Sequence, residues 1–166
     1  MPAAQDSVIR KLNAGLVTAC VIGLVLSYYA YLVETKREHD SSYEPMCDIS
    51  EHISCTKVFM SEYGKGFGLM PKNSMFNVPN SIYGLLFYTQ MSIFSMINDY
   101  AFSGVVVALG LLSNIGSIYL AYLLYMFNDI CVVCISTYVV NAAITYLAIK
   151  KFRILHVSTK NKKKMK

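Results

Sequence analysis

Four long runs without a charged residue divide this chain. They cover residues 12–33, 73–98, 100–128 and 130–149. Each run approaches or exceeds the roughly 18–20 residues that cross the hydrocarbon core of a bilayer. Because backbone polar groups in lipid must find partners within a helix, the pattern predicts an all-α integral membrane protein with a four-transmembrane-helix bundle. The expected spans, within one membrane domain of residues 1–166, are about 12–33, 80–97, 101–127 and 130–149.

The composition supports a membrane protein over a water-soluble one. Hydrophobic residues make up 55% of the chain and charged residues 15%, and the mean hydropathy is +0.43. The first apolar run follows Arg10 and Lys11, as a signal peptide would. It is longer than the apolar region of a signal peptide, however, and its tyrosines make a poor cleavage site, so we expect it to remain as a span.

The distribution of charge predicts the orientation in the membrane. The tail at 150–166 carries eight lysines and arginines and no acid, whereas residues 34–72 carry seven acids against five lysines and arginines. The positive-inside rule therefore places both termini in the cytosol, and residues 34–80 become a lumenal cap between the first and second spans. We interpret the basic tail as solvated or attracted to lipid, and we do not expect a nucleic-acid partner. Its last residues, 163–166, fit a dilysine retrieval signal, which predicts the endoplasmic reticulum membrane.

The cap contains one stretch that is suited to short helical turns. Apolar residues alternate there with charge at Ile49, Ile53, Val58, Phe59 and Met60. Three glycines follow within residues 64–68 and interrupt the pattern. We therefore expect short amphipathic turns in the cap and no long helix.

Four of the five cysteines form two pairs. Cys47 and Cys55 lie in the cap, Cys131 and Cys134 form a Cys-x-x-Cys at the start of the last run, and Cys20 lies inside the first run. We expect Cys20 to serve packing. The predicted topology places both pairs on the non-cytosolic side, where disulfides persist.

Three interpretations of the paired cysteines remain open. The cap pair alone suits a structural disulfide. A zinc site with His39 or His52 is disfavoured because two spans separate the pairs, so no metal is expected. The third interpretation is a redox relay, in which thiol–disulfide exchange passes electrons from one pair to the other. The first turn of a helix favours a thiolate at the Cys-x-x-Cys, although Asp129 opposes that effect.

The last span continues the Cys-x-x-Cys with polar residues on one face. Cys131, Cys134, Tyr138 and Asn141 are spaced by three, four and three residues. Polar groups inside a membrane are costly and are often functional, although a lone Tyr or Asn can also join two helices. A tyrosine one turn deeper than a dithiol suits hydrogen bonding to a lipid-soluble oxidant. The pattern therefore favours a thiol–quinone oxidoreductase.

Several longer motifs resemble the vitamin K epoxide reductase family. They are GKGFGL at 64–69, NVPNSIYGLLFY at 77–88, GSIYLAYLLY at 116–125 and CVVCISTY at 131–138, together with Cys47-Asp48 and Cys55. The resemblance covers roughly residues 12–150. Tyr63 and Tyr83 stand where the family often has Trp and Phe.

The resemblance implies an activity and a role for each site residue. The expected reaction is reduction of vitamin K 2,3-epoxide to the quinone and of the quinone to the hydroquinone. Cys134 would be the nucleophile and Cys131 its resolving partner, and Cys55 and Cys47 would in turn reduce that pair. The residues implied in substrate binding are Asn80, Tyr138, Phe59 and Phe87.

The resemblance also implies the partners. The electron donor would be a lumenal thioredoxin-like oxidoreductase or a small external dithiol, with no tightly bound cofactor. The ligands would be a lipid-soluble quinone and 4-hydroxycoumarin inhibitors. An alternative is a quinone-linked thiol oxidase of the same family, which would form disulfides in secreted proteins. A scaffold with a structural disulfide is a second alternative, but it leaves the Cys-x-x-Cys and Tyr138 unexplained.

Overall fold

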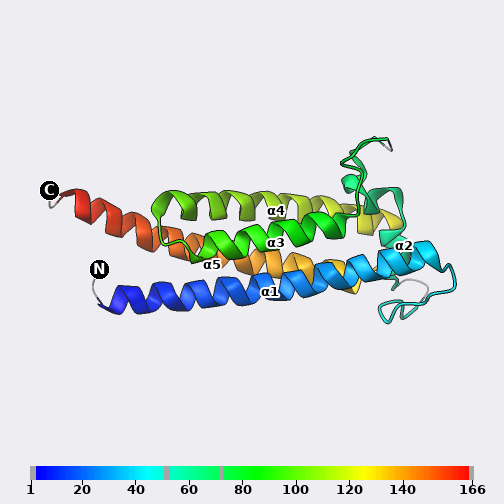
Figure 1. The fold of residues 1–166 in the computed structure, drawn as a ribbon, viewed down its shortest axis with the longest axis horizontal. Helices are drawn as coiled ribbons and strands as arrows, with labels where there is room; N and C mark the ends of the chain where they lie inside the picture. Colours follow the sequence, from blue (N-terminus) through cyan, green and yellow to red (C-terminus); the bar gives the residue numbers. More distant parts are fainter. Residues whose placement is uncertain (1–2, 51–52, 72, 165–166) are drawn as a thin grey trace.

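The computed structural model describes residues 3–50, 53–71 and 73–164. Four long helices lie side by side (Figure 1): α1 (Ala3–His39), α3 (Asn80–Met96), α4 (Tyr100–Phe127) and α5 (Val132–Lys164). Three short helices lie between α1 and α3, namely α2 (Cys55–Phe59), η1 (Glu62–Gly64) and η2 (Gly66–Gly68). The described residues form isolated β-bridges and no strand, so the all-α prediction is confirmed.

Three of the long helices are long and apolar enough to cross a membrane. Within the described residues these candidate spans are Gln5–His39, Tyr100–Phe127 and Val132–Lys160. Helix α3 has 17 residues and is the shortest of the four long helices. Helices α1 and α5 continue past residues 33 and 149, where the sequence predicted their spans to end, because lysine, arginine and glutamate are good helix formers.

Local signals in the sequence explain several helix ends. The side chain of Asp99 accepts hydrogen bonds from the backbone N–H groups of Ala101 and Phe102, which caps the start of α4. That helix ends at Asn128, whose backbone is left-handed with φ 57°. The Ser54 hydroxyl accepts a bond from the Lys57 N–H and so starts α2. Short helical turns therefore do occur in the segment where the sequence predicted them.

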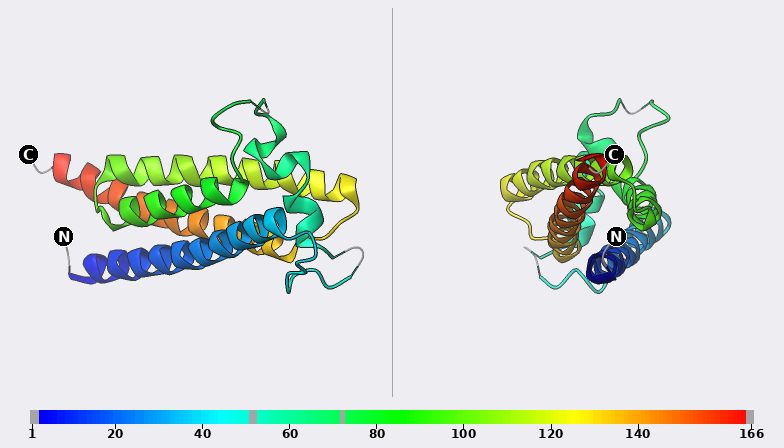
Figure 2. Two further views of the ribbon diagram at one scale, coloured as in Figure 1. Left: turned by 45° about the vertical axis from the view of Figure 1, so that its right-hand side comes forward. Right: turned by 90° about the vertical axis from the view of Figure 1, so that its left-hand side faces the viewer.

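The chain termini lie together at one end of the long helices, and the segment at 40–79 lies at the other (Figures 1 and 2). We call residues 40–79 the connecting segment. The turn between α4 and α5 lies at the same end as this segment. Cysteines that are far apart in the sequence are therefore brought to one end of the molecule.

Two clusters of buried apolar side chains fill the space between the helices. The first lies midway along the long helices and contains Leu16, Cys20, Tyr88, Met91, Val106, Val140, Ile144 and Ala148. The second lies under the connecting segment and contains Ala30, Val33, Cys47, Cys55, Phe59, Leu124, Cys131 and Val133. Many apolar side chains also face outward, including Val25, Leu112, Ile118 and Val139. A surface of this kind suits contact with lipid.

Polar side chains join the helices inside this apolar surrounding. The Tyr88 hydroxyl donates to Asn141 Oδ1 at 2.9 Å, and Asn141 Nδ2 donates to Ser117 Oγ at 3.0 Å. Asn114 Nδ2 donates to Thr145 Oγ1 at 2.7 Å. These bonds tie α3, α4 and α5 together.

Candidate functional site

Both predicted cysteine pairs are disulfides. The Cα atoms of Cys47 and Cys55 are 5.8 Å apart, and those of Cys131 and Cys134 are 5.2 Å apart. Cys20 is a free thiol buried in the first apolar cluster, as its expected packing role requires. Of the two histidines considered for zinc, His39 bonds to the Thr35 carbonyl, and His52 lies outside the described residues.

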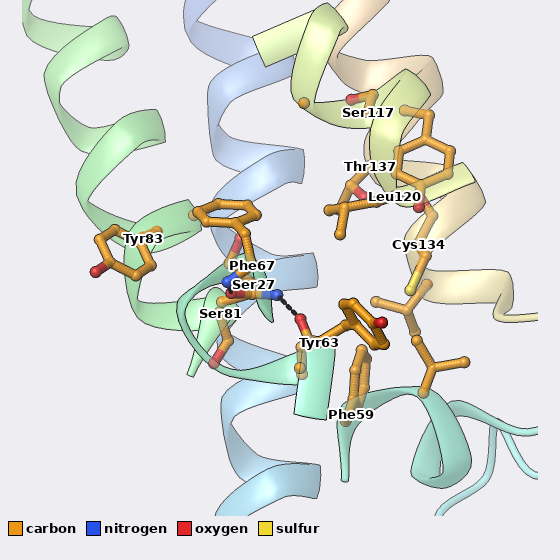
Figure 3. A pocket seen from close by; sticks show the side chains of 18 of the residues that line it. Ser27, Phe59, Tyr63, Phe67, Ser81, Tyr83, Ser117, Leu120, Cys134 and Thr137 are labelled. Atoms are coloured by element: carbon orange, nitrogen blue, oxygen red, sulfur yellow. Dashed lines mark hydrogen bonds between the residues drawn. The ribbon is translucent and has the colours of Figure 1, made fainter. Parts of the chain in front are cut away.

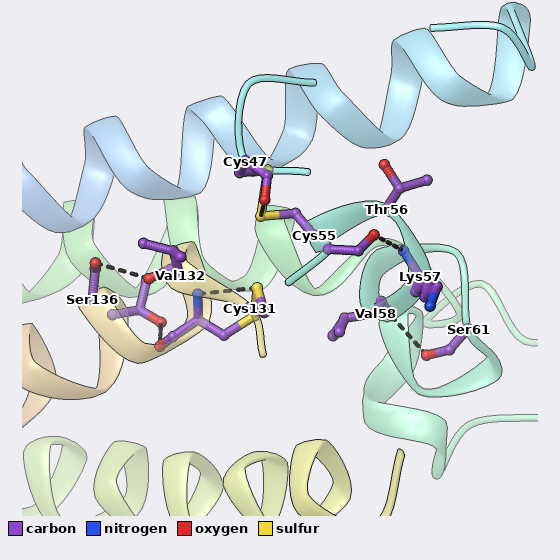
Figure 4. The surroundings of a disulfide bond; sticks show 12 residues. Cys47, Cys55, Thr56, Lys57, Val58, Ser61, Cys131, Val132 and Ser136 are labelled. Carbon is purple, nitrogen blue, oxygen red and sulfur yellow. Dashed lines mark hydrogen bonds between the residues drawn. A yellow bond between two sulfur atoms is a disulfide. The ribbon is translucent and has the colours of Figure 1, made fainter. Parts of the chain in front are cut away.

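A short backbone pairing places the two disulfides next to each other. Ile53 forms a parallel bridge with Ile130, and the Ser54 N–H donates to the Ile130 carbonyl at 3.1 Å. Cys55 and Cys131 directly follow the paired residues, and both are fully buried. Figure 4 shows the two cysteines facing each other from the connecting segment and from the start of α5. This arrangement suits thiol–disulfide exchange between the pairs.

The first turn of α5 directs a backbone N–H toward the Cys131 sulfur. The Cys134 backbone N–H donates to Cys131 Sγ at 3.2 Å (Figure 4). The carboxylate of Asp129, which opposes a nearby thiolate, forms an ion pair with Lys57 at 3.5 Å. The lysine offsets part of the negative charge, so the helix end is better able to stabilise a thiolate on this pair.

Asp48 attaches the loop before Cys55 to the N-terminus of α2. Its Oδ1 atom accepts a hydrogen bond from the Thr56 N–H at 3.1 Å. Partial burial acts to raise the pKa of Asp48, but hydrogen bonds from Thr56, Ser54 and Cys55 outweigh it and leave the pKa below its usual range. The side chain is therefore a carboxylate at neutral pH, which a helix N-terminus favours.

A pocket of about 400 Å³ lies between the long helices and the connecting segment. This volume is in the range that holds a drug-sized or cofactor-sized molecule. All four residues that were implied in substrate binding line it, namely Phe59, Asn80, Phe87 and Tyr138. Of the paired cysteines, Cys134 lines the pocket, whereas Cys131 is fully buried beside it. Figure 3 shows the Cys134 sulfur on the pocket wall, above Phe59.

The predicted substrate-binding polar groups differ in their present partners. The Tyr138 hydroxyl is buried and has no hydrogen-bond partner among the described residues. Since buried hydroxyls are nearly always paired, this group is available to a bound ligand. Asn80 already donates from Nδ2 to the Tyr63 carbonyl at 2.7 Å, and its Oδ1 accepts from the Phe67 N–H at 2.9 Å (Figure 3). One N–H of its amide is left to donate to a ligand.

The structure adds aromatic residues that the sequence interpretation did not include. Tyr63 and Phe67 line the pocket from η1 and η2. Phe67 has a left-handed backbone with φ 56°, between Gly66 at φ 54° and Gly68 at φ 69°. A non-glycine residue pays a cost for that conformation, which is offset here by the bond to Asn80. The glycines of GKGFG were the available signal, because they permit the left-handed turn.

Polar residues on α1 and α3 were also missed. Glu34, Ser27 and Ser81 line the pocket wall on the side of Asn80. Asn141 was noted in the sequence for its helical face, and it too lines the pocket with Ser117 and Tyr88. The pocket therefore has polar groups at both ends and apolar walls between them. It suits a mostly apolar molecule that carries hydrogen-bonding groups.

Relatives with known names match most of this chain. Residues 15–149 match the model of the Vitamin K epoxide reductase family. The chain is 39% identical over 137 residues to "Vitamin K epoxide reductase complex subunit 1" of Mus musculus, covering 80% of this chain and 85% of the relative. It is 38% identical to the protein of that name from Rattus norvegicus, with the same coverage. On this evidence the chain belongs to the vitamin K epoxide reductase family of oxidoreductases.

Proposed function

We propose that this protein is a membrane-embedded, thiol-dependent reductase of vitamin K 2,3-epoxide and vitamin K quinone. The observation that carries the proposal is the position of Cys134. Cys134 opens onto a pocket that Asn80 and Tyr138 also line, while the Cys47–Cys55 disulfide lies beside its partner Cys131. A reactive sulfur, two hydrogen-bonding groups and a second redox pair are the parts that such a reduction needs.

The reaction begins with the reduced Cys131–Cys134 pair. The Cys134 thiolate attacks the ring carbon of the substrate, and Asn80 and Tyr138 hydrogen-bond to the oxygens on which negative charge develops. Each such donor typically contributes a few kcal/mol to transition-state stabilisation. Neither side chain brings a net charge into the apolar pocket, which keeps the cost of burial low.

The resolving step completes the transfer of two electrons from the thiols to the substrate. Cys131 attacks Cys134, which closes the Cys131–Cys134 disulfide and releases the product. Two thiols and the epoxide thus give the quinone, water and one disulfide, and two thiols and the quinone give the hydroquinone and one disulfide. Cys55 then attacks Cys131, and Cys47 resolves that mixed disulfide, so that the Cys47–Cys55 pair ends oxidised.

The position of Phe59 and Phe87 supports a role in holding the ring. Phe59 is a buried residue of the connecting segment, and Phe87 packs edge-on to Tyr88 at 5.2 Å between ring centroids. Both face the pocket, where aromatic side chains stack against a flat ring system. The same walls would receive 4-hydroxycoumarin inhibitors.

The proposed setting is the endoplasmic reticulum membrane. Helices α1, α3, α4 and α5 would be the four spans, and the connecting segment would be a lumenal cap that meets a thioredoxin-like electron donor. Two observations support this orientation, namely that both termini lie at one end of the helices and that the basic residues of α5 lie toward that end (Figure 1). The retrieval signal predicted at 163–166 extends beyond the described residues at its last two positions.

The test is dithiothreitol-driven conversion of vitamin K epoxide to the quinone by the purified protein in detergent, read by chromatography. We expect turnover by the wild-type protein and none by Cys134→Ala. The matched control is Cys20→Ala, which removes a buried free thiol that is not among the residues lining the pocket. Reduction of a quinone without any turnover of the epoxide would indicate the thiol oxidase instead. Turnover of neither substrate by the folded protein would refute the proposal.

A further inference from the structure

A buried carboxyl group in the pocket wall has no role in the mechanism so far. Glu34 is 3% exposed, and it is the acidic residue among the described residues that line the pocket. Acidic side chains are rarely buried so completely unless a partner or a function retains them. An isolated charge in apolar surroundings costs far more than a neutral carboxyl group.

The periodicity of α1 directs Glu34 into the pocket. Ser27, Ala30 and Glu34 are spaced by three and four residues, so they share one face of the helix. All three line the pocket. In the middle of α1 this face packs against the other helices. Near the C-terminal end of α1 the same face reaches the pocket, where it carries the Glu34 carboxyl group.

The contacts of Glu34 place it beside the predicted substrate-binding amide. Its Oε2 atom accepts a hydrogen bond from the hydroxyl of Ser81, which is itself 7% exposed. Ser81 follows Asn80 directly at the start of α3. The carboxyl group is thus held at the same end of the pocket as the Asn80 side chain.

The basic residue nearest to this site is engaged elsewhere. Lys65 forms an ion pair with Glu38 at 2.6 Å. The ion pairs found among the described residues do not include Glu34. With a hydroxyl as its partner and no paired cation, Glu34 is suited to carry a proton, as a carboxylic acid.

We propose that Glu34 is the acid that protonates the substrate oxygen at the Asn80 end of the pocket during quinone reduction. This inference rests on the proposed function and adds a proton donor to it. The quinone gains two electrons from the Cys131 and Cys134 thiols, which end as a disulfide, and each of its two oxygens gains one proton. One proton comes from the Glu34 carboxyl and the other from the Cys131 thiol as it attacks Cys134. Once the hydroquinone leaves, the Glu34 carboxylate regains through lumenal water the proton that Cys134 released on becoming a thiolate. The two protons released by the thiols balance those taken up, so Glu34 is unchanged over a cycle.

The hydrogen bond from Ser81 explains how the acid is oriented. It fixes one carboxyl oxygen against α3 and leaves the other to face the pocket. A role limited to joining α1 and α3 would need only a hydrogen-bond acceptor, which a glutamine also provides. The difference between the two roles is therefore the proton, and the glutamine variant separates them.

The experiment compares Glu34→Gln with Glu38→Gln in dithiothreitol-driven quinone reduction across a pH series. Glu38 lies one turn further along α1, is exposed and forms its ion pair with Lys65, so its variant makes the same substitution outside the pocket. We expect kcat of Glu34→Gln to fall about 100-fold, as is typical for loss of a general acid, with KM within about threefold and an unchanged midpoint of thermal unfolding. The Glu38→Gln variant keeps its kcat within about threefold.

The pH dependence of kcat distinguishes a proton donor from a residue with a purely structural role, because only loss of the donor changes it. The titratable groups that surround the carboxyl or share the pocket are Glu38, Lys65, Tyr63, Tyr83, Tyr88, Cys134 and Tyr138. We expect kcat of the wild-type protein to fall on the alkaline side as the acid loses its proton, and this limb to be missing in Glu34→Gln. A glutamine variant with near-wild-type kcat and the same alkaline limb would overturn the proposal.

A second variant decides the question if Glu34→Gln does not fold. Ser81→Ala removes the hydroxyl that stabilises the carboxylate and leaves the acid, so we expect its alkaline limb to move to higher pH. An alkaline limb at the wild-type position would overturn the proposal. Failure of the proposed function itself is distinct from either result, because the wild-type protein would then turn over neither substrate.

Discussion

Replacement of Gly23 by alanine tests whether α1 and α3 pack as closely as the structure shows. A Cβ atom at Gly23 would overlap three carbons of the Tyr88 ring. That ring is 2% exposed and packs among Leu16, Met91 and Ile144, so any shift of the ring disturbs this buried cluster. Forcing one extra carbon into such a site typically costs about 1–3 kcal/mol.

A displaced Tyr88 ring also weakens a hydrogen bond. Its hydroxyl donates to Asn141 at 2.9 Å, and interhelical bonds of this kind contribute about 0.6–1.7 kcal/mol in a membrane protein. The intrinsic preference of a helix for alanine over glycine returns about 1 kcal/mol. We therefore expect Gly23→Ala to lower the free energy of unfolding by about 1–3 kcal/mol.

The assay is unfolding in mixed detergent and sodium dodecyl sulfate, followed by circular dichroism. Gly116→Ala is the matched control, because Gly116 also lies inside a long helix and nothing lies within 4 Å of its added Cβ atom. It should be neutral or up to about 1 kcal/mol more stable than the wild type. Equal stability of the two variants would refute the close packing of Gly23 on Tyr88.

Three further variants test the relay, the C-terminal end of α3 and the connecting segment. Cys47→Ala should impair turnover driven by a thioredoxin-like protein more than turnover driven by dithiothreitol, since a small dithiol reaches the Cys-x-x-Cys directly; equal losses would contradict the relay. Lys151→Met removes an ammonium that donates to the Ser95 carbonyl at 2.7 Å and the Ile97 carbonyl at 2.9 Å. It should lower the free energy of unfolding by about 2–3 kcal/mol, because a buried carbonyl loses a charged donor, whereas Lys150→Met, whose lysine lies over the Tyr146 ring, should change it by less than about 1 kcal/mol in the same detergent titration. The pKa of Asp48 is depressed, so its stabilising contribution is present at neutral pH and is lost as pH falls through the folded-state value. The midpoint of thermal unfolding should therefore drop on acidification, and Asp48→Asn should start lower at pH 7 and change less; a parallel drop in both proteins would count against this role.

The cysteine pairs and the helical class could be predicted because both depend on short-range patterns. Charge-free runs predicted helices, and the structure is helical. Cys131 and Cys134 are one turn apart, and they form a disulfide. The site residues carried over by resemblance, such as Asn80 and Tyr138, line one pocket together with Cys134.

The residues that sequence reasoning missed depend on contacts between distant segments. Glu34 stands at the boundary of an apolar run, where an acid normally faces water. Its burial follows from the position of Ser81, which is 47 residues away in the chain. The left-handed backbone of Phe67 is likewise supported by Asn80 and by the Tyr119 hydroxyl, at 3.3 Å from the Phe67 carbonyl. The glycines of GKGFG indicate the turn itself, but no local pattern indicates which distant residues contact it.

The two hydrogen bonds of Asn80 to the connecting segment have a thermodynamic consequence. Tyr63 and Phe67 fix the orientation of the Asn80 amide. The position of the amide that a ligand bonds to therefore depends on the folding of the connecting segment. The coupling between ligand binding and folding of the connecting segment is reciprocal. A ligand that prefers the fixed amide must therefore stabilise the folded segment by the same free energy. Ligand affinity and protection of the segment from hydrogen exchange therefore rise and fall together, including in variants that never touch the ligand.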